Sequence, residues 1–381
     1  MSSERAVDGP TFVLHPCAVV NEQTFTKLES PAPVSSTNIG HGAGGDPLDR
    51  AIVISEAERR QKTLTTENRQ LGVLLVHARG YVVLKNAVPL DLVEEIRHLF
   101  KDIYADCAAS NYKKRGVEPI SGDRTGTMFW ERIARFRIFP RLTGPFADPF
   151  VLANPFALEI INEALGERLY CKSVASDTCV KGAMLQAPHR DLDFYDGKTP
   201  FGLNVNIPIM HCGLHNGPLE VWPGGSHLWY GEKFFRYGVL PFTQDGENPP
   251  AESFMGYIPS KKVELFPGDL LIRDPGMWHR GTPNPTDEPR TMLTQSFFRR
   301  SFYYDYGDPL HSLDETLFEQ LDPSIKPYFS YCFDRSDPLY WKLHRTRTMQ
   351  KLEKRRYLGA PFRIGGRWIE RAKDEMKKRG Y

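Results

Sequence analysis

Four side chains in this chain of 381 residues have the chemistry of a redox-metal site. His189 and Asp191 lie two residues apart, so on an extended strand they project from the same face. His279 follows far downstream, and Arg290 comes eleven residues after it. Two imidazoles and one carboxylate with open positions are the ligand set of non-haem ferrous oxygenases. Arg290 offers a planar, charged fork for the distal carboxylate of a dicarboxylic cosubstrate. The pattern predicts an oxygenase that uses iron(II), 2-oxoglutarate and O₂.

Other carboxylates and imidazoles near this motif fit a shared metal ion less well. Asp193 lies four residues after His189, which is too far for a common ion if the backbone stays extended. His211 and His215 flank a tight loop and have no partner at ligand spacing, and His227 ends a Pro-Gly-Gly-Ser-His turn. We therefore leave these four out of the predicted ligand set.

Short apolar segments separated by Gly and Pro turns dominate the second half of the chain. They are typical of antiparallel strands, which we place at 169–174, 203–210, 219–222, 263–266, 270–273 and 291–299. Upstream, the apolar pattern predicts helices at 51–76, 90–108 and 155–165 and a strand at 80–84. The expected fold is α+β, mainly β, with a double-stranded β-helix (jelly-roll) core and flanking N-terminal helices.

The composition divides the chain into three parts. Residues 1–50 are rich in Pro, Ser, Gly and Thr, which predicts an extended N-terminal arm. Residues 51–300 hold the predicted jelly-roll oxygenase domain. From Trp341 onward there are fourteen Lys or Arg against four Asp or Glu, so residues 301–381 are expected to be a helical basic extension packed on the same domain. Such charge runs usually face water, and binding of an anionic partner is the alternative.

The overall composition is that of a soluble globular protein, and the cytoplasm is its expected location. The net charge of +2 gives no strong attraction to nucleic acid or to a membrane surface. No apolar run approaches the roughly 20 residues of a membrane span, and the first residues lack the apolar core of a secretory signal. The six cysteines have no paired spacing and are expected to be reduced thiols. The oligomeric state stays open.

The order of the motifs resembles the phytanoyl-CoA dioxygenase-like family of iron(II)/2-oxoglutarate oxygenases over about residues 65–300. The matching segments are His189-Arg190-Asp191 with the following Phe194, Asn216-Gly217-Pro218-Leu219, the turn 223–227, Pro267-Gly268-Asp269 before His279, Pro283-Asn284 before Arg290, and the strand and helix of residues 80–108. Three positions depart from the family pattern: Pro188 stands where Trp is frequent, Gly225 is an extra turn residue, and Thr291 replaces a common second Arg. These departures concern loop shape and substrate choice.

The resemblance implies iron(II) held by the two histidines and the aspartate of the motif, with 2-oxoglutarate as cosubstrate and O₂ as oxidant. Arg290 is then expected to bind the 5-carboxylate of the cosubstrate. Gln186 matches a position that often hydrogen-bonds the cosubstrate, and Asn206 lies close to a strand position that contacts it; ordinary barrel-interior polarity is the alternative for both. The expected reaction hydroxylates or desaturates a small organic substrate, such as a specialised metabolite or an acyl-CoA, and releases succinate and CO₂.

Three other functions stay open at this point. A cupin-type metal dioxygenase or isomerase would need no 2-oxoglutarate, but cupins typically have His-x-His and a downstream Glu, which this motif lacks. A barrel that has lost its metal could serve as a binding module, although the ligands and Arg290 are intact. A nucleic-acid oxygenase could use the basic tail as a clamp on the backbone, and its binding would depend strongly on salt.

Overall fold

The computed structural model describes residues 50–111, 126–132, 134–166, 168–191, 200–224, 258–303 and 308–345. The predicted arm (residues 1–50, apart from Arg50) and the basic segment after residue 345 lie outside the described residues. Within the described ranges, no helix combines the length and the apolar composition that a bilayer span requires.

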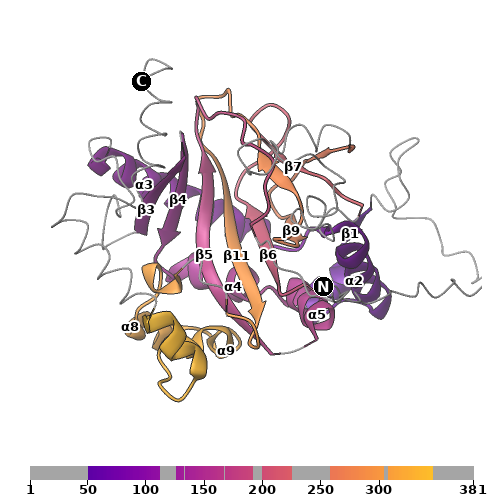
Figure 1. Cartoon of the computed structure of the whole chain (residues 1–381), viewed down its shortest axis with the longest axis vertical. Helices are drawn as coiled ribbons and strands as arrows, with labels where there is room; N and C mark the ends of the chain where they lie inside the picture. The colour runs from indigo at the N-terminus through magenta and orange to yellow at the C-terminus, as the bar shows by residue number, and fades with distance from the viewer. Residues whose placement is uncertain are drawn as a thin grey trace, which may run out of the picture. The chain divides into compact units, whose positions relative to one another are not determined.

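Two β-sheets form the centre of the described chain (Figure 1). The larger sheet has the strand order β1-β2-β9-β6-β11-β5-β4-β3, and the smaller has the order β10-β7-β8. The strands are β1 (Ala51–Val53), β2 (Tyr81–Lys85), β3 (Gly126–Arg132), β4 (Arg135–Pro140), β5 (Leu169–Cys179), β6 (Gly202–Pro208), β7 (Leu219–Val221), β8 (Lys261–Val263), β9 (Leu270–Arg273), β10 (His279–Gly281) and β11 (Arg290–Arg299). Only β1 and β2 pair in parallel among the described strand pairs. A large, mostly antiparallel sheet with helices is consistent with the predicted jelly roll.

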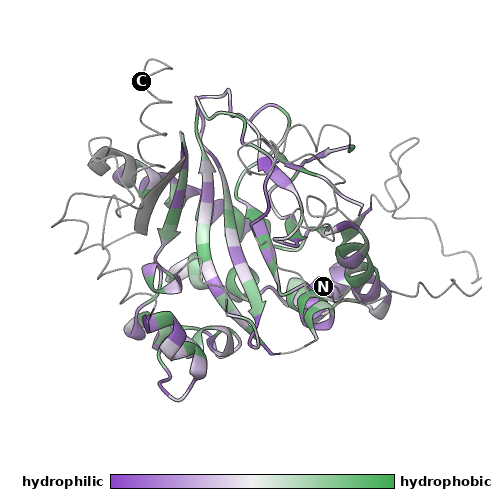
Figure 2. Cartoon of the chain, in the orientation of Figure 1, coloured by the Kyte–Doolittle hydropathy of each residue, from purple (hydrophilic) through white to green (hydrophobic). Residues whose placement is uncertain are grey.

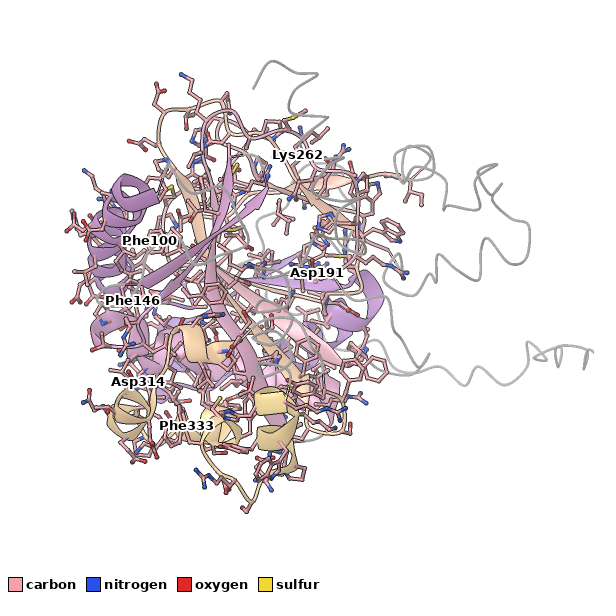
Figure 3. All side chains as sticks on the ribbon, turned by 60° about the vertical axis from the view of Figure 1, so that its left-hand side comes forward. Phe100, Phe146, Asp191, Lys262, Asp314 and Phe333 are labelled. Carbon is pink, nitrogen blue, oxygen red and sulfur yellow. The ribbon has the colours of Figure 1, made fainter. Side chains whose placement is uncertain are left out.

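Helices flank the larger sheet, and several of them contact its strands. They are α1 (Glu56–Gln61), α2 (Thr66–Arg79), α3 (Leu90–Asn111), α4 (Pro149–Leu152), α5 (Pro155–Leu165), α8 (Glu315–Gln320) and α9 (Lys326–Phe329). Helix α2 contacts α5 and β2, α5 contacts β6, α3 contacts β3 and β4, and α9 contacts β5. In Figure 3, Phe100 of α3 and Phe146 lie to one side of the central strands, and Asp191 lies to the other. The face that carries Asp191 is therefore the one turned away from α3.

Side-chain alternation along the strands separates an apolar face from a mixed one. Val82 and Leu84 of β2 belong to the core shared with the helices, whereas Tyr81 and Val83 belong to a second cluster shared with the smaller sheet. Along β6 the odd-numbered residues join the helical core, so Asn204 and Asn206 face the smaller sheet. Figure 2 shows this change of colour from residue to residue along the strands. The polar residues that can do chemistry thus lie between the two sheets.

The prediction of a single helix over residues 51–76 is wrong, because this segment forms β1, α1 and α2. Ser55 and Glu58 form a reciprocal capping box that starts α1. Helix α1 ends at Lys62, which has the left-handed φ of 54°, and Thr65 then caps α2. The Ser-x-x-Glu pattern of this capping box is visible in the sequence. The prediction used the apolar pattern alone, which does not show that the segment is divided into a strand and two helices.

Strands β1, β3, β4 and β10 were not predicted from the apolar pattern. The other strands agree with the expected ones to within a few residues, and α5 has the predicted bounds. Residues 308–345 form short helical segments, and ion pairs of Arg141 with Asp314 and of Arg300 with Asp337 attach them to the rest of the domain. The helical form and the packing of the basic segment after residue 345 stay a prediction.

Candidate metal centre and cosubstrate cavity

His189 and His279 come from distant parts of the chain and are held together by their backbones. They form an isolated antiparallel bridge in which each amide N–H donates to the other residue's carbonyl at 2.9 Å. The Nδ1 atom of His189 lies 2.9 Å from the carbonyl of Ala187, and Nδ1 of His279 lies 2.9 Å from that of Met277. A ring that donates from Nδ1 keeps the lone pair of Nε2 for a metal ion. Both imidazoles are thus oriented for coordination through Nε2.

Asp191 completes the group with one of its two carboxylate oxygens. Its Oδ1 lies 3.9 Å from Nε2 of His189 and 3.5 Å from Nε2 of His279. The three potential ligand atoms all lie within 4.8 Å of one another, and no other such group occurs among the described His, Cys, Asp and Glu residues. Two imidazoles and a carboxylate that leave one side open fit ferrous iron as in non-haem oxygenases. The structure thus brings the three predicted ligands together.

The second oxygen of Asp191 is engaged by the protein. Oδ2 accepts a hydrogen bond from Nη2 of Arg273 at 2.8 Å and one from Nδ2 of Asn204 at 3.5 Å. Burial by itself raises the pKa of Asp191, but the charges of His279 and Arg273 lower it well below its usual range. The carboxylate is therefore ionised and turned so that Oδ1 alone faces the imidazoles.

Replacing Arg273 with Met should lower the affinity for iron(II) by about 10- to 100-fold, which is the usual cost of removing a group that orients a metal ligand. Without the bond to Oδ2, the Asp191 carboxylate can rotate away from the two imidazoles. Anaerobic titration with iron(II) measures the effect. Arg280→Met is the matched control, because it removes the 2.6 Å ion pair with Glu220 beside His279, and it should leave iron affinity unchanged.

A cavity of about 260 Å³ opens beside the three potential ligands. Its lining includes Gln186 and Arg290 as well as His189, Asp191 and His279. Arg290 is only 3% exposed, and its Nε and Nη1 have no hydrogen-bond partner among the described residues. A buried guanidinium with free donors is costly unless an anion pairs with it. Arg290 therefore fits the carboxylate of a bound cosubstrate.

The two predicted amide contacts differ in position. Gln186 lines the cavity, and its Oε1 accepts from the backbone N–H of Gly281 at 2.7 Å. Asn206 is not among the described residues that line the cavity, and its Oδ1 accepts from Nε of Arg273 at 3.3 Å. Asn206 thus supports the arginine that holds Asp191. Direct contact of Gln186 and Asn206 with the cosubstrate stays a prediction.

The histidines left out of the predicted site lie elsewhere or outside the described residues. Nε2 of His211 is 2.8 Å from Glu264, and its ring stacks on Phe266 with centroids 4.3 Å apart. The ring of His215 packs beside that of His211. Asp193 and His227 lie outside the described residues. Among the described residues, neither His211 nor His215 belongs to a group that could hold a metal ion.

Four arginines in the cavity lining were not among the predicted site residues, namely Arg135, Arg137, Arg190 and Arg273. Arg137 pairs with Asp177 at 3.2 Å, and the guanidinium of Arg190 lies 5.4 Å from the centroid of the Trp278 ring. Alternation of Arg and Phe at 135–137 was the available signal for a strand with a basic face. The partners of these arginines are distant in sequence, so their roles could not be assigned in advance.

Asp274, in the turn between β9 and His279, should make the stability of the protein depend on pH. Burial raises its pKa from 3.8 to about 7, although its carboxylate accepts from the N–H of Gly276 at 2.7 Å. Across that window the folded state binds more protons than the unfolded state, so the free energy of unfolding falls by about 1.4 kcal/mol per pH unit as the pH rises. Denaturant unfolding at several pH values should show this decline in the wild type. Asp274→Asn keeps an oxygen that accepts from Gly276 and should remove the contribution of Asp274 to the decline of unfolding free energy with pH. An identical pH dependence in both proteins would contradict the raised pKa of Asp274.

A comparison with protein families agrees with this geometry. The family model described as phytanoyl-CoA dioxygenase (PhyH) matches residues 76–292, more than half of the chain, and this range includes the three potential ligands and Arg290. Similar solved structures include AviO1 from Streptomyces viridochromogenes Tue57, at 17% identity and a TM-score of 0.44, covering 63% of this chain and 99% of that one. Another is EctD from S. alaskensis with bound Fe, at 18% identity and a TM-score of 0.42, covering 62% and 78%.

A third is the non-heme alpha ketoglutarate dependent carbocyclase SnoK from nogalamycin biosynthesis, at 16% identity and a TM-score of 0.44, covering 68% of this chain and 92% of that one. Likenesses at this level carry no weight for the substrate or reaction of this chain. The family match is of a different kind, because it spans the ordered motifs and the residues that the structure gathers around one cavity. The chain belongs to the phytanoyl-CoA dioxygenase family of iron(II)- and 2-oxoglutarate-dependent oxygenases.

Proposed function

We propose that this protein is an iron(II)- and 2-oxoglutarate-dependent dioxygenase that hydroxylates or desaturates a small organic substrate and releases succinate and CO₂. One observation carries the proposal: a His-Asp-His group with converging ligand atoms shares a cavity with the buried Arg290, whose Nε and Nη1 have no hydrogen-bond partner among the described residues. The first feature suits ferrous iron, and the second suits the far carboxylate of a dicarboxylic acid.

In this proposal each residue has a separate task. The Nε2 atoms of His189 and His279 and Oδ1 of Asp191 hold the iron, which supplies the activation of O₂ when bound. Arg290 binds the 5-carboxylate of 2-oxoglutarate and so sets the cosubstrate's orientation relative to the metal. Arg273 keeps the Asp191 carboxylate in place. Because Asp191 occupies a metal position, no position is left for a halide, and hydroxylation or desaturation is favoured over halogenation.

The cavity limits the substrate to a small molecule or to one end of a longer molecule. Its volume of about 260 Å³ is below the roughly 300–1,000 Å³ of sites that enclose drug-sized ligands. 2-Oxoglutarate and the reacting part of the substrate must share this space. A specialised metabolite fits such a site, and an acyl-CoA would have to leave most of its length outside the described cavity.

The test is turnover of 2-oxoglutarate by the iron-loaded protein with a library of small metabolites. We expect release of succinate that requires iron, together with a product that has gained one oxygen atom or lost two hydrogen atoms by mass spectrometry. A cupin-type enzyme would transform a substrate without consuming 2-oxoglutarate. A metal-free binding module would not bind iron(II) in an anaerobic titration, and either result would replace the proposal.

A further inference from the structure

Arg273 has hydrogen-bond donors that its support of the metal ligands does not use. Its Nη2 donates to Oδ2 of Asp191 at 2.8 Å, and its Nε donates to Oδ1 of Asn206 at 3.3 Å. A guanidinium has more N–H groups than these two bonds require. Its Nη1 is buried and has no hydrogen-bond partner among the described residues. Unmet donors on a buried cation are costly, so an acceptor is expected at Nη1 when the site is loaded.

These donors belong to a residue of the cavity wall. Arg273 lines the cavity together with His189, Asp191 and His279, and its side chain is only 6% exposed. Asn204 also donates to Asp191, at 3.5 Å, but it is not among the described lining residues. Of the two described residues that hold Oδ2 of Asp191, Arg273 is therefore the one that can also contact a bound molecule.

Arg273 and Arg290 enter the cavity from opposite ends of the strands. In the register of the larger sheet, Arg273 of β9 lies level with Asn204 of β6, which pairs with Ser296 of β11. Ser296 lies six residues from Arg290, or about 20 Å along the strand. The bond from Nε of Arg273 to Asn206 shows that this side chain extends toward the level of Arg290. Both long side chains thus reach the same cavity from opposite directions.

This arrangement suits a molecule with a carboxylate at each end. A 2-oxo acid chelates a metal ion through its keto oxygen and one oxygen of the adjacent carboxylate. The other oxygen of that carboxylate keeps its lone pairs and needs a donor. The metal-binding end of such a molecule lies beside Asp191, which Arg273 contacts, and the far carboxylate is the group assigned to Arg290.

We propose that Arg273 binds the free oxygen of the 1-carboxylate of 2-oxoglutarate, so that arginines hold both ends of the cosubstrate. The proposal rests on the oxygenase function proposed above and adds a second binding residue to Arg290. Arg273 then has two tasks, because Nη2 keeps Asp191 in position and Nη1 donates to the cosubstrate. Hydrogen bonds from a guanidinium to a carboxylate are among the strong ones, and burial strengthens them further.

Two ligands that differ at this oxygen provide the test. 2-Oxoglutarate is compared with succinic acid monohydroxamate, which keeps the far carboxylate and chelates through two oxygens but has no free oxygen at the metal end. The protein is saturated with cobalt(II), whose visible absorption reports each ligand, so a variant with lower metal affinity can still be compared. In Arg273→Met, the affinity for 2-oxoglutarate should fall at least about tenfold and that for the hydroxamate less than about threefold.

Three variants separate this contact from other effects. Asn204→Ala is the matched control, because it removes the other bond to Oδ2 of Asp191 and should leave the ratio of the two affinities unchanged. Arg290→Met should weaken both ligands alike, since both have the far carboxylate. Arg273→Lys keeps the charge and one nitrogen donor, so its ratio should lie between those of the wild type and Arg273→Met.

Equal losses of the two ligands in Arg273→Met would overturn the proposal, because the effect would then act through Asp191 and the metal. So would an unchanged affinity for 2-oxoglutarate, or a change of the ratio in Asn204→Ala as large as that in Arg273→Met. If thermal melting shows that Arg273→Met does not fold, Arg273→Gln takes its place with the same expected losses. Failure of the oxygenase function itself would appear differently, as no binding of 2-oxoglutarate to the cobalt-loaded wild type.

Discussion

Replacing Asp191 with Ala should reduce succinate formation to less than about one-hundredth of the wild-type rate. Loss of a residue that only orients a metal ligand costs about 10- to 100-fold, and loss of the ligand itself should cost more. The variant keeps two imidazoles whose spacing is set by backbone hydrogen bonds, but it lacks the negative charge that partly neutralises the iron. Anaerobic iron(II) titration and an assay of succinate measure the two effects.

Asp177→Asn provides the control for Asp191→Ala. Asp177 also lines the cavity, but its carboxylate pairs with Arg137 at 3.2 Å, and it does not belong to the group of potential metal ligands. Iron affinity should be unchanged in this variant. Wild-type turnover by Asp191→Ala would show that the metal is held by other residues.

Replacing Arg290 with Met should raise the KM for 2-oxoglutarate by roughly 30-fold to several thousand-fold. Truncating one partner of a buried, hydrogen-bonded charge pair costs about 2–5 kcal/mol, and each 1.4 kcal/mol is tenfold in affinity. Arg290→Lys should lie in between, because an ammonium keeps the charge but lacks the planar fork. Initial-rate assays of succinate formation at varied 2-oxoglutarate give the KM directly.

Two further measurements separate a binding role of Arg290 from a structural one. Iron(II) affinity should be unchanged in Arg290→Met, since Arg290 is not a potential metal ligand. The protein without cosubstrate should be as stable as the wild type or more so, because the substitution removes a buried charge whose Nε and Nη1 have no partner among the described residues. A lower melting temperature with an unchanged KM would assign Arg290 to the fold.

Local sequence signals were sufficient to predict the elements whose first and last residues are typical helix-start and helix-end residues. Helix α5 has Pro155 in its first turn and Gly166 as a left-handed C-cap, and both marks can be read without a structure. The metal triad was predicted from the joint spacing of its members, because His189 and Asp191 lie at strand spacing and a predicted strand leads through a Pro-Gly turn to His279. Family resemblance in the motifs then gave Arg290 its expected role.

The contacts that hold the site residues in place could not be predicted, because they join residues that are far apart in the chain. In the sequence, Arg273 is only the last residue of an apolar strand. Its hydrogen bond to Asp191 joins residues that are 82 positions apart in the chain. Arg135 and Gly281 come together only when β4 of the larger sheet lies opposite β10 of the smaller one. The alternation of Asn204 and Asn206 indicated a polar face, and only the structure connects that face to Arg273 and Asp191.

The mutual backbone hydrogen bonds of His189 and His279 also bear on which metal the protein acquires. The two imidazoles are already close together before an ion binds, so binding requires little rearrangement of the site. The same geometry accepts other divalent ions of similar size. Affinity for divalent ions should then follow the Irving–Williams order, in which nickel, copper and zinc exceed iron. Occupancy in the cell is set by metal supply, and protein exposed to traces of zinc should stay inactive until it is stripped by a chelator and reloaded with ferrous iron in the absence of oxygen.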